Sequence, residues 1–241
     1  MKEDRIAAVV FDYGNVLSLT PEPADYHELQ RLAQLEEKAF LLLYWRYRLD
    51  YDRNVLDAPG YWRRIAQENG REFSAAQIQH LIATDIALWT RTNASMLAWV
   101  SALRVGGVKT AVLSNMPVNF SAYLRTSADW MQHFDHHVFS GELGLLKPDP
   151  AIYRACLEGL QVKPEETLFI DDRPVNVEGA QAMGMHGVVF ETLPQLSSEV
   201  QRFGLPALLA QARLNSQLAP RAGQNPGDDD SKASPECSRQ D

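Results

Sequence analysis

Short continuous runs of apolar residues, rich in β-branched side chains, recur along the chain with longer segments of helical periodicity between them. The first run, IAAVVF at residues 6–11, shows no alternation of polar and apolar positions. Such runs are typical of strands that are buried on both faces of a parallel sheet. Similar runs predict further strands at 109–114, 136–140, 167–171 and 187–190.

The segments between these runs predict helices, and their order predicts the fold class. Helical patterns lie at 94–105, 117–127, 149–160 and 174–184. Strand and helix alternate over this part of the chain, which predicts βαβ units and therefore an α/β fold with a parallel sheet wrapped by helices. Because the crossovers are right-handed, the carboxyl ends of the strands lie at one edge of the sheet. Residues that follow different strands are therefore expected to meet in one crevice.

Residues 19–92 interrupt the alternation with helical patterns and no strand-like run. The turn signals DAPG and ENGREF separate these helical segments. We expect an inserted helical cap that lies over the crevice. The α/β core then comprises residues 1–18 and 93–213.

The insert is rich in aromatic residues, and two arginines lie among them. At helical spacing, aromatic side chains more often belong to a core than to a ligand site. We therefore expect core positions for Tyr44, Trp45, Tyr47, Tyr51, Tyr61, Trp62 and Trp89. Arg46 and Arg48 could meet a substrate anion, but a solvated helix face is the favoured interpretation.

The C-terminal segment 214–241 differs in composition from the rest of the chain. From residue 219 onward it contains no large aliphatic or aromatic side chain. Such a segment cannot offset the entropy of its own ordering. We expect a disordered acidic tail without chemistry of its own.

Composition and charge exclude several classes of function. Hydrophobic residues make up 45% of the chain and charged residues 22%, as in ordinary soluble domains. A net charge of -8 argues against a nucleic-acid partner, since binding of the phosphate backbone depends on clustered Lys and Arg. The apolar run near the start is too short for a signal peptide or a membrane span, and the 2 cysteines do not make a disulfide framework. We expect a cytoplasmic protein with no nucleic-acid and no membrane partner.

Polar residues of distinct chemistry follow several of the predicted strands. Asp12 ends the first strand and, taken alone, could simply cap a turn. Ser114 and Asn115 precede a predicted helix start, where a hydroxyl, an amide and backbone N–H groups can hold phosphate oxygens. Lys147 can pair with a phosphate and with the charge of a nucleophile. The adjacent carboxylates at 171–172 repel each other unless a cation is present, which favours Mg²⁺.

The segments VVFDYGNVL, LSNMP, LGLLKPDPAIY and LFIDDRPVNVEGAQAMGM resemble, in order and context, the motifs of the haloacid dehalogenase superfamily. The resemblance covers nearly all of residues 5–195, and the insert resembles the helical cap of the first subclass. The SNMP and IDD variants are similar to those of sugar-phosphate phosphatases and of the phosphatase domains of epoxide hydrolases. The resemblance implies a Rossmann-like core and a Mg²⁺-dependent phosphomonoester hydrolase. Such an enzyme acts on a small phosphorylated metabolite through an aspartyl-phosphate.

The resemblance also implies roles for individual residues. Asp12 matches the catalytic nucleophile, and Lys147 matches the catalytic lysine that balances its charge and contacts the phosphate. Ser114 and Asn115 match the phosphate-binding residues. These expectations rest on position within the matching motifs.

For the metal site, the resemblance implies four oxygen donors. Asp12 and Asp172 match the usual carboxylate ligands. Asp171 is expected either to support these ligands from outside the coordination sphere or to act as an alternative ligand. The backbone carbonyl of Gly14 matches a further ligand. Asn176 occupies a position at which many relatives have another aspartate.

Gly14 departs from the common family pattern. At that position most relatives have a second aspartate, which donates a proton to the leaving oxygen and later activates water. Positioned proton transfer typically contributes about 10²- to 10⁴-fold in rate. We therefore expect a phosphatase biased toward activated monoesters, such as a sugar 1-phosphate, an acyl phosphate or an aryl phosphate.

Alternatives to this function remain open. A catalytically weak or silent module that binds a phosphorylated metabolite would account for the loss of the acid at Gly14, although it has no need of a nucleophile. A haloacid dehalogenase also uses an aspartate nucleophile, but it needs no metal and does not explain the acidic pair at 171–172. The sequence does not decide the physiological substrate, the oligomeric state or the role of Tyr13.

Overall fold

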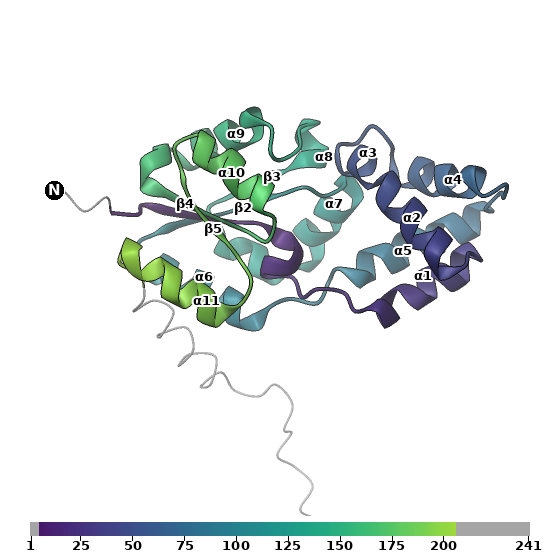
Figure 1. The fold of residues 1–241 in the computed structure, drawn as a ribbon, viewed down its shortest axis with the longest axis horizontal. Helices are drawn as coiled ribbons and strands as arrows, with labels where there is room; N and C mark the ends of the chain where they lie inside the picture. Colours follow the sequence, from purple (N-terminus) through teal and green to yellow (C-terminus); the bar gives the residue numbers. More distant parts are fainter. Residues whose placement is uncertain (1–4, 206–241) are drawn as a thin grey trace, which may run out of the picture.

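The computed structural model describes residues 5–205, which form an α/β core and a helical cap side by side (Figure 1). The core contains a five-stranded sheet in which every neighbouring pair of strands is parallel. Its strands, in the order in which they lie in the sheet, are β3 (His136–Phe139), β2 (Lys109–Ser114), β1 (Ala8–Phe11), β4 (Thr167–Asp171) and β5 (His186–Val189). The predicted α/β fold with a parallel sheet is therefore confirmed.

The register of the strands places their carboxyl ends at one edge. Phe11, the last residue of β1, pairs with Val112 of β2 on one side and with Ile170 of β4 on the other. Figure 1 shows that this edge faces the cap. Residues that follow β1, β2 and β4 therefore lie between the two parts of the molecule.

Helices cover both faces of the sheet. On one face the side chains of Val9 and Phe11 pack in a cluster with Trp99 and Leu196. On the other face Val10 packs with residues of the helices that precede and follow β4. The core helices are α6 (Ala94–Val105), α7 (Val118–Ser127), α8 (Ser140–Leu143), α9 (Pro150–Leu160), α10 (Pro174–Ala182) and α11 (Leu193–Glu199), with short 3₁₀ turns at Asp129–His133, Pro164–Glu166 and Val200–Phe203.

Local sequence signals start these helices where the structure has them. Proline occupies the first turn of α9, and the Asp149 side chain accepts a hydrogen bond from the Ala151 N–H at 2.9 Å. The Asn93 side chain accepts in the same way from the Met96 N–H at the start of α6. Proline at the first position and a short polar side chain at the cap are standard helix starts.

The insert between β1 and β2 is helical throughout and has a hydrophobic core of its own. Its largest fully buried side chains include Tyr44, Tyr61 and Trp62, which pack together away from the core clusters. Gln34 adopts a left-handed conformation (φ 53°) and ends the first helix. The helices of the insert are α1 (His27–Ala33), α2 (Glu37–Arg46), α3 (Arg48–Asp52), α4 (Ala58–Glu68) and α5 (Ala75–Leu88), after a 3₁₀ turn at Pro23–Tyr26.

The two segments that join the insert to the core run side by side. Ser18 and Thr92 form an antiparallel bridge. The Leu19 N–H donates to the Arg91 carbonyl and the Asn93 N–H donates to the Leu17 carbonyl, both at 2.7 Å. These contacts support a boundary between residues 18 and 19 and between 92 and 93, which stays a prediction.

Two further expectations concern a membrane span and the C-terminal segment. None of the helices within residues 5–205 is long and apolar enough to cross a membrane. The predicted tail, 214–241, and the end of the predicted core, 206–213, lie outside the described residues.

Candidate active site

Asp12 lies directly after β1, at the edge of the sheet that faces the cap. Its backbone is extended (φ -66°, ψ 159°), and one of its carboxylate oxygens, Oδ1, accepts a hydrogen bond from the Tyr13 N–H at 2.7 Å. The residue is 7% exposed. A carboxylate at this place is desolvated but still reachable from the cavity described below.

Lys147 brings the ends of three strands together. Its ammonium nitrogen, Nζ, lies 2.8 Å from Asp12 Oδ1 and 2.6 Å from Asp171 Oδ2. It also donates to the backbone carbonyl of Leu113 on β2, at 2.9 Å. The Lys147 side chain is 1% exposed, so these contacts are screened little by water.

Burial and the neighbouring charges shift the pKa values of Asp12 and Lys147 in opposite directions. Burial raises the pKa of Asp12 to about 7, although the neighbouring Lys147 ammonium acts to lower it. Burial acts against the charge on Lys147, but the carboxylates of Asp12 and Asp171 outweigh it and keep the lysine pKa above its ordinary value. The lysine is therefore a permanent positive charge beside a carboxylate that is costly to ionise without additional positive charge.

Ser114 is the last residue of β2 and Asn115 follows it, as predicted, but their side chains have different partners. Ser114 is buried and lines the cavity. The Asn115 amide instead holds the backbone of Lys147: its Oδ1 accepts from the Lys147 N–H at 2.8 Å, and its Nδ2 donates to the Lys147 carbonyl at 3.2 Å. The Asn115 side chain therefore positions the lysine, a use that its spacing in the sequence does not reveal.

Asp171 and Asp172 end β4 and have different partners. Asp171 is fully buried, and its oxygens accept hydrogen bonds from the Arg173 N–H and the Asn176 side chain in addition to the contact with Lys147. Asp172 is partly exposed, and its Oδ2 accepts from the Asn15 side chain at 2.7 Å. Burial is the main cause that raises the pKa of Asp172.

Three carboxylates converge at this edge of the sheet. Asp12, Asp171 and Asp172 each offer an oxygen atom, and these atoms lie within 4.8 Å of one another. Two amide oxygens nearby, Oδ1 of Asn15 and Oδ1 of Asn176, are buried and have no hydrogen-bond partner among the described residues. An all-oxygen set with unpartnered acceptors beside it suits a hard divalent cation.

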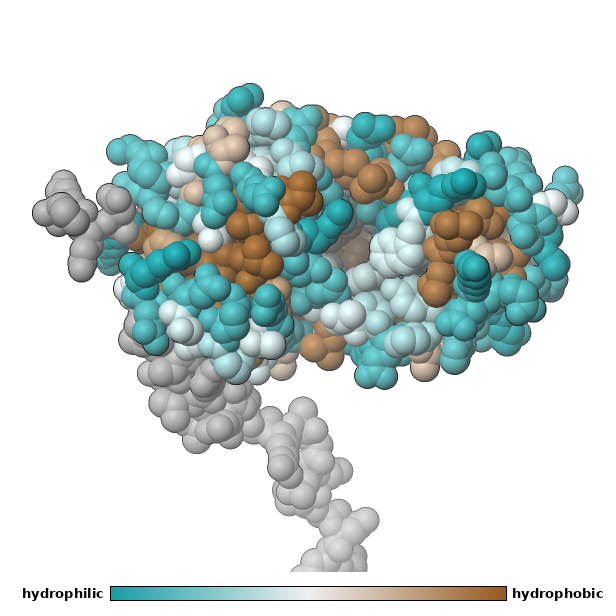
Figure 2. Space-filling model, viewed as in Figure 1, coloured by the Kyte–Doolittle hydropathy of each residue, from teal (hydrophilic) through white to brown (hydrophobic). Residues whose placement is uncertain are grey.

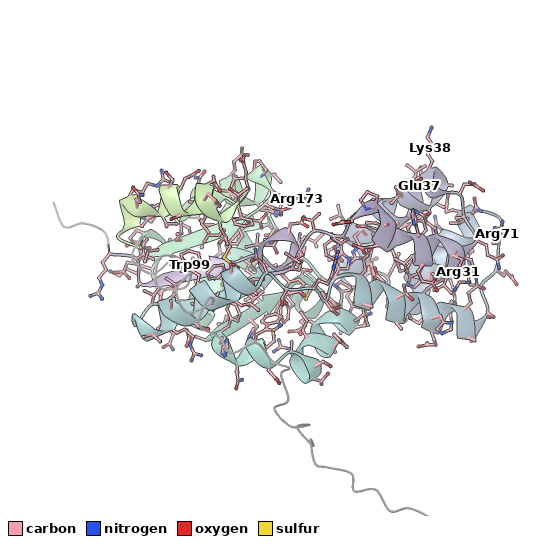
Figure 3. The ribbon with its side chains drawn as sticks, turned by 90° about the horizontal axis from the view of Figure 1, so that it is seen from below. Arg31, Glu37, Lys38, Arg71, Trp99 and Arg173 are labelled. Atoms are coloured by element: carbon pink, nitrogen blue, oxygen red, sulfur yellow. The ribbon has the colours of Figure 1, made fainter. Side chains whose placement is uncertain are left out.

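A cavity of about 410 Å³ opens between the core and the cap. Figure 2 shows the hollow where the two parts meet, and Figure 3 shows Arg173 on the side of the core that faces the cap. The cavity is lined by the predicted site residues of the core except the fully buried Asp171, and by a second wall that belongs to the cap. Its lining consists of Asp12, Tyr13, Gly14, Asn15, Ser114, Asn115, Met116, Phe120, Lys147, Asp172, Arg173 and Asn176 from the core, and of Trp45, Arg48, Leu49, Asp52 and Trp89 from the cap.

The cap wall contains a buried charged cluster that the sequence does not predict. Arg48 Nε lies 3.0 Å from Asp52 Oδ1, and its Nη1 lies 3.2 Å from Asp85 Oδ1. Nη1 also donates to the Tyr44 hydroxyl at 2.8 Å, and that hydroxyl donates to Asp85 at 2.6 Å. The expectation of a solvated face is therefore wrong for Arg48, because Tyr44 of α2 and Asp85 of α5 bury it together with Asp52 of its own helix. Arg46 is exposed, as expected.

The aromatic residues of the cap divide into two groups. Tyr44, Tyr51 and Tyr61 are buried in the cap core, as predicted. The prediction is wrong for Trp45, which is 49% exposed and lines the cavity, and incomplete for Trp89, which packs against both the cap and the core and also lines it.

Tyr13 packs beneath the junction between cap and core. Its ring stacks on Trp130 and meets Phe120 edge-on. Its hydroxyl donates to the Trp89 carbonyl at 2.6 Å. Tyr13, next to Asp12, is thus a support for the last turn of the cap.

The comparison with protein families decides which family this arrangement represents. A family model described as haloacid dehalogenase-like hydrolase matches residues 6–184. The chain belongs to the haloacid dehalogenase-like hydrolases. In this hydrolase the matching segment includes the cap and the strand ends that carry all the residues of the core wall.

Two curated relatives of this haloacid dehalogenase-like hydrolase are longer proteins. It is 32% identical over 114 residues to bifunctional epoxide hydrolase 2 of Rattus norvegicus. The matched residues make up 46% of this chain and 21% of the relative. It is 32% identical over 205 residues to the drimenol cyclase drtB of Aspergillus calidoustus. This match covers 84% of this chain and 37% of the relative. The chain therefore spans a minor part of the length of these relatives.

Solved structures of the same fold are also found. A HAD family enzyme from Bacteroides thetaiotaomicron, in complex with magnesium and inorganic phosphate, superposes with a TM-score of 0.64 at 22% sequence identity. The match covers 79% of this hydrolase and 98% of that enzyme. It shows that the two share a fold.

Proposed function

We propose that this hydrolase is a Mg²⁺-dependent phosphomonoester hydrolase that works through an aspartyl-phosphate on Asp12. The observation that carries the proposal is the position of the Asp12 carboxylate. It lies 2.8 Å from the buried ammonium of Lys147 and within reach of two further carboxylates at the mouth of a cavity. A nucleophile beside a fixed positive charge and a cation site is the arrangement that phosphoryl transfer needs.

The residues present fit a magnesium ion. Asp12, Asp172 and the Gly14 carbonyl would hold it, and Asp171 would support the site from behind, since its oxygens already contact Lys147 and Asn176. A bound Mg²⁺ would neutralise charge on the phosphate oxygens and on Asp12. The relative from Bacteroides thetaiotaomicron was solved with magnesium and phosphate, which supports the choice of ion.

Individual groups of this chain bind the phosphate, stabilise its charge, attack the phosphorus and position the lysine. The Ser114 hydroxyl and the backbone N–H groups that follow β2 bind phosphate oxygens, while Lys147 stabilises the charge that develops on them. Asp12 attacks the phosphorus and forms the covalent phospho-aspartate. The Asn115 amide keeps the lysine in place through its two backbone hydrogen bonds.

The cavity walls restrict the class of substrate. Beside the phosphate site lie Trp45, Leu49 and Trp89 of the cap and Phe120 of the core. Apolar and aromatic walls bind an apolar or aromatic group better than a bare polyol. The substrate class is therefore a phosphomonoester with an apolar or aromatic part. Activated monoesters, such as aryl phosphates and sugar 1-phosphates, belong first in the screen because they have good leaving groups.

A second candidate function is a silent module that binds a phosphorylated metabolite. Gly14 favours it, since the side chain that normally transfers the proton is absent. The burial of Asp12 beside Lys147 argues against it, because a module that only binds phosphate gains nothing from a buried carboxylate that repels the anion. A haloacid dehalogenase is a weaker alternative, since its chemistry leaves the three converging carboxylates without a use.

The test is steady-state hydrolysis of p-nitrophenyl phosphate by the purified protein, with Mg²⁺ and with chelator. We expect metal-dependent turnover that Asp12→Asn abolishes. Asp149→Asn is the matched control, because Asp149 caps α9 outside the cavity and asparagine also caps helices. Turnover no higher than that of Asp12→Asn would contradict the proposal and favour the binding module.

A further inference from the structure

The proposed reaction needs a group that protonates the leaving oxygen, and Gly14 cannot supply it. Several ionisable groups line the cavity and are candidates for this role. Arginine stays protonated in proteins and the lysine is held charged by its carboxylate neighbours, so neither transfers a proton readily. Asp12 and Asp172 are assigned to the nucleophile and the cation. The Tyr13 hydroxyl donates to the Trp89 carbonyl, and burial raises its pKa above the ordinary value, so it is a poor proton donor. Among the described residues that line the cavity, the carboxyl of Asp52 remains.

Asp52 is held in a defined position by contacts that cross between cap and core. It is the last residue of α3, and its backbone carbonyl accepts a hydrogen bond from the Ser140 hydroxyl at 2.6 Å. The preceding residue, Tyr51, donates through its hydroxyl to Asn119 Oδ1 at 2.8 Å. The carboxyl thus comes from the cap but is attached to the core, and it lines the same cavity as Asp12.

The charged groups around Asp52 allow its carboxyl to be protonated close to neutral pH. One guanidinium, Arg48, serves two buried carboxylates, Asp52 and Asp85. Arg173 acts on Asp52 from the core side through charge alone. Burial raises the pKa of Asp52 to about 6, with Arg48 acting against the shift and Asp85 adding to it. A carboxyl with a pKa in this range can give and take a proton near neutral pH.

We infer that Asp52 is the acid and base that replaces the side chain missing at Gly14. The inference rests on the proposed function. As the Asp12 oxygen forms its bond to phosphorus and the bond from phosphorus to the ester oxygen breaks, the Asp52 carboxyl gives its proton to that ester oxygen, and the alcohol leaves. In the second step the Asp52 carboxylate takes a proton from water as the water oxygen attacks the phosphorus, which frees Asp12 and releases phosphate.

The surroundings of Gly14 allow the missing group to be restored. Its backbone (φ -60°, ψ 130°) is open to any residue. A Cβ atom added there would meet Cζ3 of Trp89 at 4.0 Å, an ordinary van der Waals distance. Gly14→Asp therefore supplies a rescue test.

The experiment compares two monoesters that share an aromatic ring, p-nitrophenyl phosphate and 2-phenylethyl phosphate, in the presence of Mg²⁺. The nitrophenolate leaves without help, while the alkoxide needs a proton. We expect Asp52→Asn to lower kcat/KM for the alkyl ester by about 10²- to 10⁴-fold and to change the aryl ester far less. Gly14→Asp in the Asp52→Asn background should restore the alkyl activity.

Asp85→Asn is the matched control, since it disturbs the same buried cluster without lining the cavity. At a pH well below 6, where Asp52 is protonated in both proteins, it should keep the ratio of alkyl to aryl activity. Its pH profile should shift to lower pH, because Asp85 raises the pKa of Asp52. Alkyl activity of the unmodified protein should fall as the pH rises through about 6, and Asp52→Asn should remove this limb.

The outcomes separate this inference from the function on which it rests. Equal effects of Asp52→Asn on both esters, or an unchanged pH limb, would overturn the role of Asp52 while the aryl activity that depends on Asp12 still stands. Absence of Asp12-dependent turnover on either ester would overturn the phosphatase function itself. Failure of Asp52→Asn to fold, judged by circular dichroism, leaves the pH profile of the unmodified protein as the second test. Its kcat/KM for the alkyl ester should fall relative to that for the aryl ester as the pH rises through about 6, and a ratio that does not change with pH would also overturn the inference.

Discussion

Removal of the Lys147 ammonium is the change that best tests the electrostatics of the site. Lys147→Met keeps an apolar stem of similar length and removes two buried ion pairs, with Asp12 at 2.8 Å and with Asp171 at 2.6 Å. It also removes a hydrogen bond to the Leu113 carbonyl. Both carboxylates stay behind in a place that water hardly reaches.

The expected loss of stability is large for a single substitution. Breaking a buried ion pair by removing one partner typically costs about 3–5 kcal/mol, because the other charge is left uncompensated. For a domain of this size, each kcal/mol corresponds to roughly 2–4 °C in Tm. We therefore expect Lys147→Met to lower the Tm by roughly 6–20 °C at pH 8 in chelator.

The sign of the pH dependence follows from the pKa of Asp12. That pKa is about 7 with the lysine in place, and since Lys147 lowers it, the variant raises it further. A carboxyl whose pKa in the folded state lies above its unfolded value, near 3.9, contributes most to stability below that unfolded value. The contribution is lost as the pH rises through the folded-state pKa. The deficit of Lys147→Met should therefore be largest at pH 8 and shrink toward pH 5.

The assay is urea unfolding followed by circular dichroism at pH 5 and pH 8, in chelator, with Lys109→Met as control. Lys109 donates to a backbone carbonyl, that of Leu160, at 2.6 Å. Its loss should cost about 0.5–1.5 kcal/mol at both pH values, as for one hydrogen bond. A deficit of Lys147→Met that is no larger than that of Lys109→Met, or that grows at low pH, would refute the reasoning.

Further predictions concern the metal site, the contacts of Asn115 with the Lys147 backbone, and the hydrogen bond between Tyr13 and the cap. Asp172→Asn should weaken Mg²⁺ activation, measured as a higher Mg²⁺ concentration for half-maximal p-nitrophenyl phosphate hydrolysis, and an unchanged Mg²⁺ curve would contradict its role as ligand. Asn115→Ala should lower kcat because the backbone of Lys147 loses both of its partners, while KM changes less; a pure KM effect would instead indicate contact with the substrate. Tyr13→Phe removes the hydrogen bond to the Trp89 carbonyl and should cost about 0.5–1.5 kcal/mol in urea unfolding, whereas no loss would show that the hydroxyl is replaced by water.

The core half of the site follows from the sequence because its residues are placed by strand order alone. Ser114 and Asp171 are the last residues of their strands and Asp12 directly follows β1, and parallel strands end at one edge. The hydrophobic runs determine where the strands end, so local pattern is enough. The use of the Asn115 amide was not predictable in this way, since its partner arrives from a loop 32 residues later.

The cap half of the site could not be predicted from the sequence. Arg48 and Asp52 have the spacing of an ordinary surface pair on a helix, and this pattern favours a solvated face. Their burial depends on contacts with distant residues. Asp52 meets Ser140 across 88 positions, and Arg48 meets Asp85 across 37. A charged pair in the wall of a cavity therefore has the same local pattern as one on the protein surface.

The bridge between Ser18 and Thr92 has a consequence for how such a protein can change over time. Viewed from the core, the insert is a loop whose two ends already touch. The entropy needed to close a loop grows only with the logarithm of its length, about 0.6 kcal/mol for each doubling. An insert of another length or sequence, joined at the same two residues, would alter the folding of the sheet very little. Substrate choice can thus diverge by exchange of a whole helical module, while the phosphate chemistry on the strands stays as it is.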